Sequence, residues 1–175
     1  QVSVYENDKH LATYCLHEDF QDFVVIGNLV FNARNVDVSI TEMMPGPRYG
    51  YMSRACMIGR FPVQHVADKV CFLSRCAKNI YVHYAGKEDR FRRIAEIKAH
   101  AMTITTMCSF PEKKNYLCSG GFDRILKIWD LATMKQITSI DLDVCINDIT
   151  PGDSGTIYYA SSNGYIGLLH SKGKI

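Results

Sequence analysis

Three short strand-like runs separated by tight turns lie within residues 99–131, and this pattern constrains the fold more than any other feature. The first run, Thr103–Phe110, ends at a polar turn. The second, Tyr116–Ser119, leads into a turn that contains two glycines, and the third, Ile125–Ile128, ends in a Trp-Asp pair. Short runs with a turn every ~8–12 residues are typical of an all-β domain.

Alternating apolar residues before a turn recur along the chain at a nearly constant spacing of about 40 residues. In the third run, Leu126 and Ile128 alternate with Lys127 and Trp129, which places the two sets on opposite faces of a strand. The positions equivalent to the tryptophan are Tyr5, Thr41, His83, Trp129 and Leu169. The short strands, the Trp-Asp ending and the period together resemble the WD40 repeat, which forms one blade of a β-propeller.

The resemblance implies an all-β fold, a WD40-type β-propeller of which about four blades are present. The expected parts of the single domain 1–175 are the end of a blade at 1–17, a degenerate blade at 18–62, a blade at 63–99, the clear WD40 blade at 100–143 and an incomplete blade at 144–175. Because a blade cannot bury both of its faces alone, we expect a larger ring of roughly seven blades or closure by a second chain. The stretch 91–98 partly follows a helical period, but the repeat favours a strand there.

The clear blade carries His100, Ser119, Asp123 and Trp129 in the order and approximate spacing of the structural network of WD40 repeats. The resemblance implies that the aspartate holds the histidine, that the histidine reaches the serine, and that the serine bonds the indole nitrogen. Serine, histidine and aspartate also form hydrolytic triads. We expect a structural role instead, because Ser119 lies in a strand without a sharp nucleophile turn. No catalytic residue is expected, and the domain is not predicted to be an enzyme.

The composition argues against strong electrostatic binding, because 20 basic residues nearly balance 18 acidic ones and the net charge is +2. The cysteines number seven and lie in apolar runs, which favours a reducing compartment, either cytoplasm or nucleus. Cys71, Cys76 and His83 lack the second pair of ligands that a metal site needs. The sequence predicts no cofactor, and no apolar stretch is long enough to span a membrane.

The resemblance implies a non-enzymatic scaffold or adaptor, a rigid WD40 platform within a eukaryotic multiprotein complex. Its partners would be other proteins of that complex, together with the rest of the propeller or a second chain that closes the ring. In the family, the turns between second and third strands and those between blades form the commonest docking surface. Arginine and aromatic side chains dominate interface energies, so the expected contact residues are Arg75, Phe122, Arg124 and Tyr165.

Two other functions stay open from the sequence. Lys87, Arg90, Arg92 and Arg93 lie in a short span and would serve an RNA- or phospho-ligand-binding propeller, although two acidic neighbours dilute their charge. Nucleic acid is therefore the less favoured partner. Alternatively, the chain would be an accessory WD40 domain of a larger enzyme whose catalytic part lies outside these residues.

Overall fold

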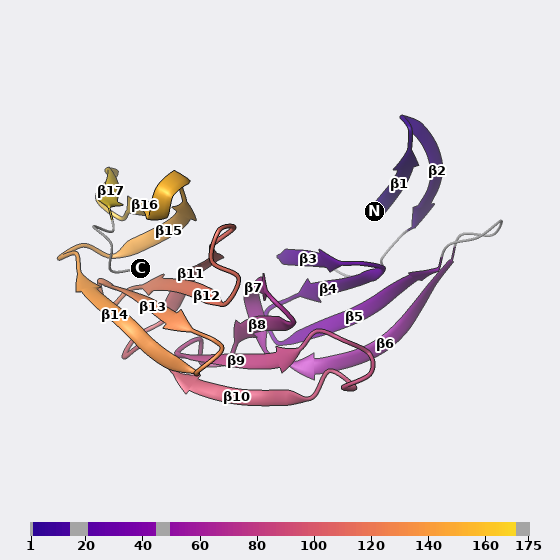
Figure 1. The fold of residues 1–175 in the computed structure, drawn as a ribbon, viewed down its shortest axis with the longest axis horizontal. Coiled ribbons are helices and arrows are strands. Elements are labelled where there is room, and N and C mark those ends of the chain that lie inside the picture. Colours follow the sequence, from indigo (N-terminus) through magenta and orange to yellow (C-terminus); the bar gives the residue numbers. More distant parts are fainter. Residues whose placement is uncertain (1, 15–20, 45–49, 171–175) are drawn as a thin grey trace.

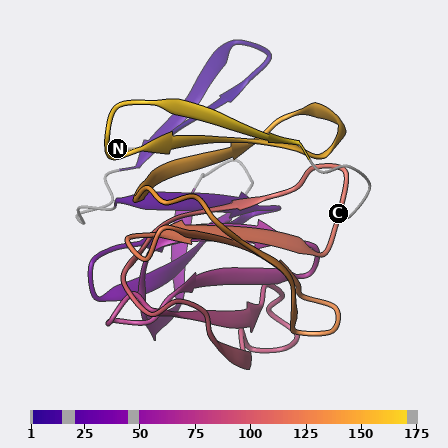
Figure 2. The same cartoon turned by 90° about the vertical axis from the view of Figure 1, so that its left-hand side faces the viewer.

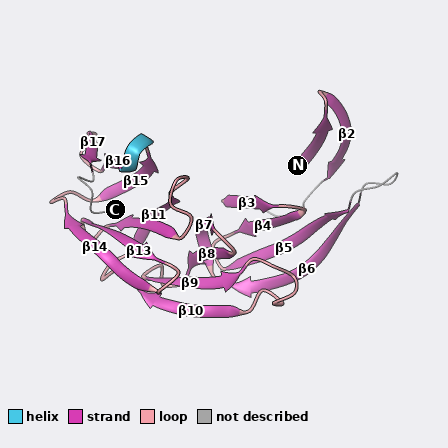
Figure 3. Ribbon diagram, viewed as in Figure 1, coloured by secondary structure: helices cyan, strands magenta, loops and turns pink. Residues whose placement is uncertain are grey.

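The computed structural model describes residues 2–14, 21–44 and 50–170, and regular structure in that part is almost entirely β-strand (Figure 1, Figure 3). The strands pair in antiparallel order into one two-stranded, three four-stranded and one three-stranded sheet. Within the described part, the 3-10 turn η1 (Asp153–Gly155) is the one helical element. The predicted all-β fold class is confirmed.

Each sheet is built from consecutive strands, so neighbours in sequence are also neighbours in the sheet. The N-terminal hairpin comprises β1 (Val2–Glu6) and β2 (Lys9–Tyr14). The first four-stranded sheet comprises β3 (Asp22–Ile26), β4 (Leu29–Ala33), β5 (Asp37–Met44) and β6 (Gly50–Ile58). The second comprises β7 (Arg60–Val66), β8 (Lys69–Leu73), β9 (Asn79–Tyr84) and β10 (Arg93–Lys98). The third comprises β11 (Ile104–Ser109), β12 (Tyr116–Gly121), β13 (Ile125–Asp130) and β14 (Lys135–Asp141). The last comprises β15 (Ile146–Pro151), β16 (Thr156–Ser161) and β17 (Ile166–His170).

The sheets lie side by side in an open arc (Figure 1). The first strand of each sheet, namely β3, β7, β11 or β15, lies on the inner side of the arc, and β6, β10 and β14 form its outer rim. These inner strands contact one another from sheet to sheet. Figure 2 shows the hairpin β1–β2 and the strands of the last sheet on the same side of the molecule, above the middle sheets. Both ends of the arc therefore lie on the same side of the middle sheets.

The positions expected to be equivalent to the tryptophan share one register in the four sheets. Each lies on the third strand, directly opposite a residue of the second strand: Thr41 opposite Val30, His83 opposite Val70, Trp129 opposite Leu117, and Leu169 opposite Ile157. Because side chains alternate between faces along a strand, these pairs lie on one face of each sheet and their sequence neighbours on the other. The period in the sequence is thus a period in the fold.

Three apolar cores lie between successive sheets. Phe31 and Ile40 of the first sheet pack with Phe72 of the second. Leu73 and Ile80 of the second pack with Leu117 and Trp129 of the third, and the third packs in the same way against Ile146 and Ile157 of the last. Burial of apolar surface contributes about 25 cal/mol per Å². The sheets are therefore held together face to face, as expected for blades that cannot stand alone.

Two local features differ from the sequence-based expectation. Strand β7 begins at Arg60, before the blade boundary expected at residue 63. Pro62 hides this strand in the sequence, since proline lacks the N–H that a sheet ladder uses, and here it lies in the irregularity between Arg60 and Val63. Strand β5 continues to Met44, whereas the alternation of apolar residues in the sequence predicts a strand over Val36–Thr41. The strand expected at 91–98 is present as β10, and the helical alternative is wrong.

Antiparallel pairing sorts the loops to two ends of the sheets. End A carries the loops that join second to third strands, β4–β5, β8–β9, β12–β13 and β16–β17, together with the links between sheets. End B carries the other loops, which include β3–β4, β7–β8, β9–β10 and β11–β12. Three of the expected parts reach outside the described residues: 1–17 at residues 1 and 15–17, 18–62 at 18–20 and 45–49, and 144–175 at 171–175. The placement of the candidate site residues follows from this geometry.

Candidate functional site

The structure brings His100, Ser119, Asp123 and Trp129 together in the third sheet. His100 lies in the link between β10 and β11, Ser119 on β12, and Trp129 on β13. Asp123 lies in the tight turn between β12 and β13, where Arg124 takes a positive φ of 68°. The four residues therefore tie the link between two sheets to the centre of one of them.

A continuous chain of hydrogen bonds connects the four side chains. The Nε1–H of Trp129 donates to the Oγ of Ser119 at 2.9 Å. The Nε2 of His100 lies 2.8 Å from that same Oγ, and its Nδ1 lies 3.0 Å from both carboxylate oxygens of Asp123. All groups are satisfied when the Ser119 hydroxyl donates to Nε2 and the Nδ1–H of His100 donates to Asp123.

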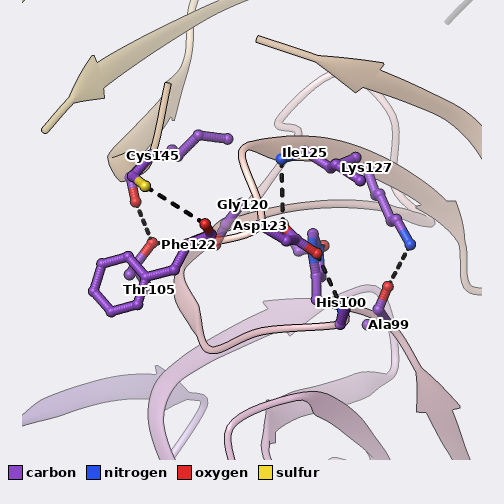
Figure 4. A network of polar contacts seen from close by, with 12 residues as sticks. Ala99, His100, Thr105, Gly120, Phe122, Asp123, Ile125, Lys127 and Cys145 are labelled. Carbon is purple, nitrogen blue, oxygen red and sulfur yellow. Dashed lines mark hydrogen bonds and ion pairs between the residues drawn. The ribbon is translucent and has the colours of Figure 1, made fainter. Parts of the chain in front are cut away.

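Asp123 and Lys127 extend this network to the backbone (Figure 4). The Asp123 carboxylate accepts hydrogen bonds from the backbone N–H of Ala101 at 3.1 Å and of Ile125 at 3.3 Å. The Nζ of Lys127 donates to the carbonyl oxygen of Ala99 at 2.5 Å and lies 5.7 Å from the centre of the Trp129 ring. Lys127 was not expected as a member of the network.

The burial of these groups favours a structural role over a chemical one. Ser119 is fully buried, and its hydroxyl oxygen is already engaged by two partners. Burial lowers the pKa of His100, although the hydrogen bond and charge of Asp123 act in the opposite direction. A nucleophile needs access to a substrate, and the Ser119 hydroxyl has none in this arrangement.

The other sheets carry only remnants of this network among their described residues. In the second sheet, Ala77 replaces the aspartate, and the Nδ1 of His83 lies 2.8 Å from the carbonyl oxygen of Phe91. The His83 ring also stacks on Phe72, with 4.8 Å between ring centres. In the last sheet, Leu169 stands at the position of the tryptophan and Tyr159 at the position of the serine. Apolar packing has replaced the polar chain in these sheets.

The four expected contact residues all lie at end A with exposed side chains. Arg75 is in the β8–β9 loop, Phe122 and Arg124 are in the β12–β13 turn, and Tyr165 is in the β16–β17 turn. Phe122 is 44% exposed and Tyr165 is 72% exposed. The residues come from three successive sheets, so they are spread along the arc instead of forming one cluster.

Three of the four basic residues in the span 87–93 contact other side chains of the fold. The Nζ of Lys87 lies 2.5 Å from Glu42 of the neighbouring sheet. The guanidinium of Arg92 lies over the ring of Tyr84, and that of Arg93 lies over another tyrosine ring and 3.9 Å from a glutamate. Lys87 is thus paired with an acid, whereas the ring contacts leave the charge of Arg92 in place and Arg90, the fourth residue of the span, is exposed.

The cysteines are not arranged as a metal site. Cys71 is buried on β8, whereas Cys76 is exposed in the β8–β9 loop. Among residues 2–14, 21–44 and 50–170, no group of three or more histidine, cysteine or acidic side chains could hold a metal ion. Burial raises the pKa of the Cys71 thiol to about 12. Cys108 and Cys118 face each other across β11 and β12 as free thiols.

A charged cluster between the first two sheets was missed by the sequence interpretation. The Glu42 carboxylate is almost fully buried and accepts from Lys87 and from the Nε of Arg54, each at 2.5 Å. A glutamate inside the strand run Thr-Glu-Met-Met was the available signal, because a charge in such a place needs a partner. Within the described part of the chain, no helix is long and apolar enough to cross a membrane.

Comparison with known proteins supports the architecture. No protein family model matches the chain. The chain is 30% identical over 71 residues to the GATOR2 complex protein WDR24 of Dictyostelium discoideum, a match that covers 39% of this chain and only 7% of that protein. The crystal structure of the computationally designed Ika4 protein superposes with a TM-score of 0.71 at 14% sequence identity, covering 91% of this chain and 95% of Ika4. The likeness to Ika4 concerns the fold alone. The chain therefore has the fold of a portion of a WD40-type β-propeller.

Proposed function

We propose that the chain is a non-enzymatic protein-interaction scaffold, a WD40 platform within a multiprotein complex. The observation that carries this proposal is the exposure of Arg75, Phe122, Arg124 and Tyr165 at one end of three successive sheets. Side chains of these types contribute most of the energy of protein interfaces. A rigid arc that presents them in fixed positions suits a docking surface. The partial similarity to WDR24, which is described as a complex protein, agrees with this role.

Simultaneous replacement of Phe122 and Arg124 by alanine should weaken partner binding at least about tenfold without unfolding the chain, since interface hot spots contribute about 2 kcal/mol or more. The measurement is quantitative co-purification of partners with the tagged protein, followed by direct titration of each recovered partner. A matched control at end B replaces the exposed residues Glu112 and Lys114 by alanine. Equal recovery with both variants would contradict the docking surface. Partner recovery that RNA competes away, together with an affinity for RNA that falls steeply as the salt concentration rises, would instead support the nucleic-acid alternative.

The last sheet exposes an apolar face, whereas the corresponding faces of the four-stranded sheets are buried. In the second sheet, the facing pair Leu73 and Ile80 is buried against the third sheet. In the last sheet, Ile166 takes the position of Ile80 and is 79% exposed. Its neighbours on this face, Leu168 and Tyr158, are 55% and 41% exposed. A hollow of about 320 Å³ lies on the same face. We infer that a further β-sheet packs there, either from the rest of the propeller or from a second chain.

The 175-residue chain should self-associate in solution through this face, because exposed apolar patches of this kind drive association. Replacing Ile166 and Leu168 by lysine should convert the associated species to a monomer in sedimentation velocity. Replacement of Met102 by lysine serves as the control, because Met102 is 51% exposed in a loop at end A. This variant should leave the mass of the associated species unchanged. A wild-type chain that sediments as a folded monomer would refute closure by a second copy of the chain.

A further inference from the structure

A pocket of about 460 Å³ lies between the first two sheets at end B, the end opposite the expected contact residues. Its walls come from the β3–β4 and β7–β8 turns, the end of β5, and the β9–β10 loop. The volume lies within the range of ~300–1,000 Å³ that is usual for ligand sites. The pocket is separate from the His100 network and from the docking residues at end A.

The apolar part of the pocket is lined by short and branched aliphatic side chains. Ile26 and Leu29 contribute from the first sheet, and Ala67 and Ala85 from the second. Leu29 and Ala85 are buried and belong to the core between the two sheets. This wall is therefore held by packing and offers a fixed surface for an alkyl chain.

The charged part of the pocket is predominantly acidic. Its lining includes three carboxylates, Glu42, Asp68 and Asp89, against the single ammonium of Lys87 and the imidazole of His65. Hydrogen bonds from the ammonium of Lys87 and from a guanidinium hold the pKa of Glu42 below its usual value, so Glu42 is a carboxylate at neutral pH. Asp68 is paired with the Nζ of Lys69 at 2.5 Å. Asp89 is exposed on the loop and has no ion pair within the described residues, so it is the carboxylate of the lining that is left for a ligand.

We propose that this pocket binds a basic side chain, lysine or arginine, presented by an extended segment of a partner protein. An aliphatic wall beside carboxylates matches a side chain with an alkyl stem and a cationic head. The stem would pack on Leu29 and Ala85, and the head would reach Asp89 and the Glu42 carboxylate. Lys87 already places one such head on Glu42 at 2.5 Å, from the loop of the neighbouring sheet.

An anionic ligand fits the pocket less well. It would meet three carboxylates, and the only ammonium in the lining, that of Lys87, would have to leave Glu42. Removal of a buried partner from a carboxylate is costly. A cationic ligand meets the opposite situation, because it adds positive charge beside Asp89. At Glu42 it would compete with Arg54 and with Lys87, whose side chain is about half exposed.

The test uses the full 175-residue chain and a capped lysine, Nα-acetyl-lysine N-methylamide, in a nuclear magnetic resonance titration of backbone amides. We expect saturable shifts at residues 84–89 with the lysine probe and with its arginine counterpart. The norleucine probe, which has the same stem without the charge, should bind at least about threefold more weakly, as should the glutamate probe. Equal binding of norleucine and lysine would overturn the proposal.

Two substitutions with opposite expected effects separate recognition from a loss of folding. Asp89→Asn should weaken binding of the lysine probe about threefold, whereas Lys87→Met should strengthen it about threefold by removing the competing cation. Glu88→Gln, an exposed neighbour outside the pocket, is the matched control and should change nothing. Effects of one sign in both variants would refute charge recognition. Tighter binding of spermidine than of the capped lysine would identify a small polyamine instead of a partner segment and would overturn the assignment.

Discussion

Replacement of Phe31 by alanine should lower the free energy of unfolding by about 3–5 kcal/mol. The Phe31 side chain is completely buried on β4, at the centre of the core between the first two sheets. Its ring packs edge-on against Phe91 of the second sheet, with 5.9 Å between ring centres. The substitution removes contacts with both sheets at once and leaves a cavity between them. Chemical denaturation monitored by circular dichroism measures the loss.

A matched substitution tests whether the loss comes from packing between the sheets. Phe122→Ala removes the same ring from a turn where it is 44% exposed, and we expect it to cost less than about 1 kcal/mol. A loss of similar size for both variants would contradict the face-to-face packing described above. The same result would also weaken the docking test, which requires that Phe122→Ala leave the fold intact.

Replacement of Ser119 by alanine should lower the free energy of unfolding by about 2–4 kcal/mol. The substitution leaves the indole N–H of Trp129 and the Nε2 of His100 buried without their shared partner. Each unsatisfied buried group costs about 1–3 kcal/mol. Denaturation curves give the free energy, and the fluorescence of Trp129 reports whether the indole loses its fixed environment.

The control and the coupling between residues make this prediction specific. Ser139→Ala on β14 changes an exposed serine and should have an effect below about 0.5 kcal/mol. In the background of Trp129→Phe, which has no indole N–H, Ser119→Ala should cost less than in the wild type, because one of the two orphaned groups is already absent. Additive losses would show that Ser119 and Trp129 do not act through the observed hydrogen bond.

Local patterns in the sequence were sufficient for most strands. Short strand-like runs between turns located β11, β12 and β13. Strand β7 was not apparent, because Pro62 interrupts its pattern and lies at a ladder irregularity. The helical period in 91–98 was misleading, because pairing with β9 decided the conformation of that segment.

The candidate sites differ in how much of each could be predicted from the sequence. His100, Ser119, Asp123 and Trp129 lie within one repeat, so their spacing along the chain, compared with that of the WD40 repeat, was enough to predict that they meet. The expected contact residues were placed by loop position, and their role remains a proposal. The pocket at end B could not be found in the same way, because Glu42 and Lys87 are separated by 45 residues and belong to different sheets.

The sequence by itself determined most of the strands and the repeat, and its resemblance to the WD40 repeat predicted the polar network of the third sheet, because each depends on residues within one repeat. Only the tertiary structure decided what lies between the sheets. It paired Lys87 and Arg92 of the β9–β10 loop with an acidic and an aromatic neighbour, left Ile166 and Leu168 uncovered, and placed three carboxylates around one cavity. The physical reason is that contacts between sheets depend on the packing of whole faces, and local propensity carries no information about which faces meet.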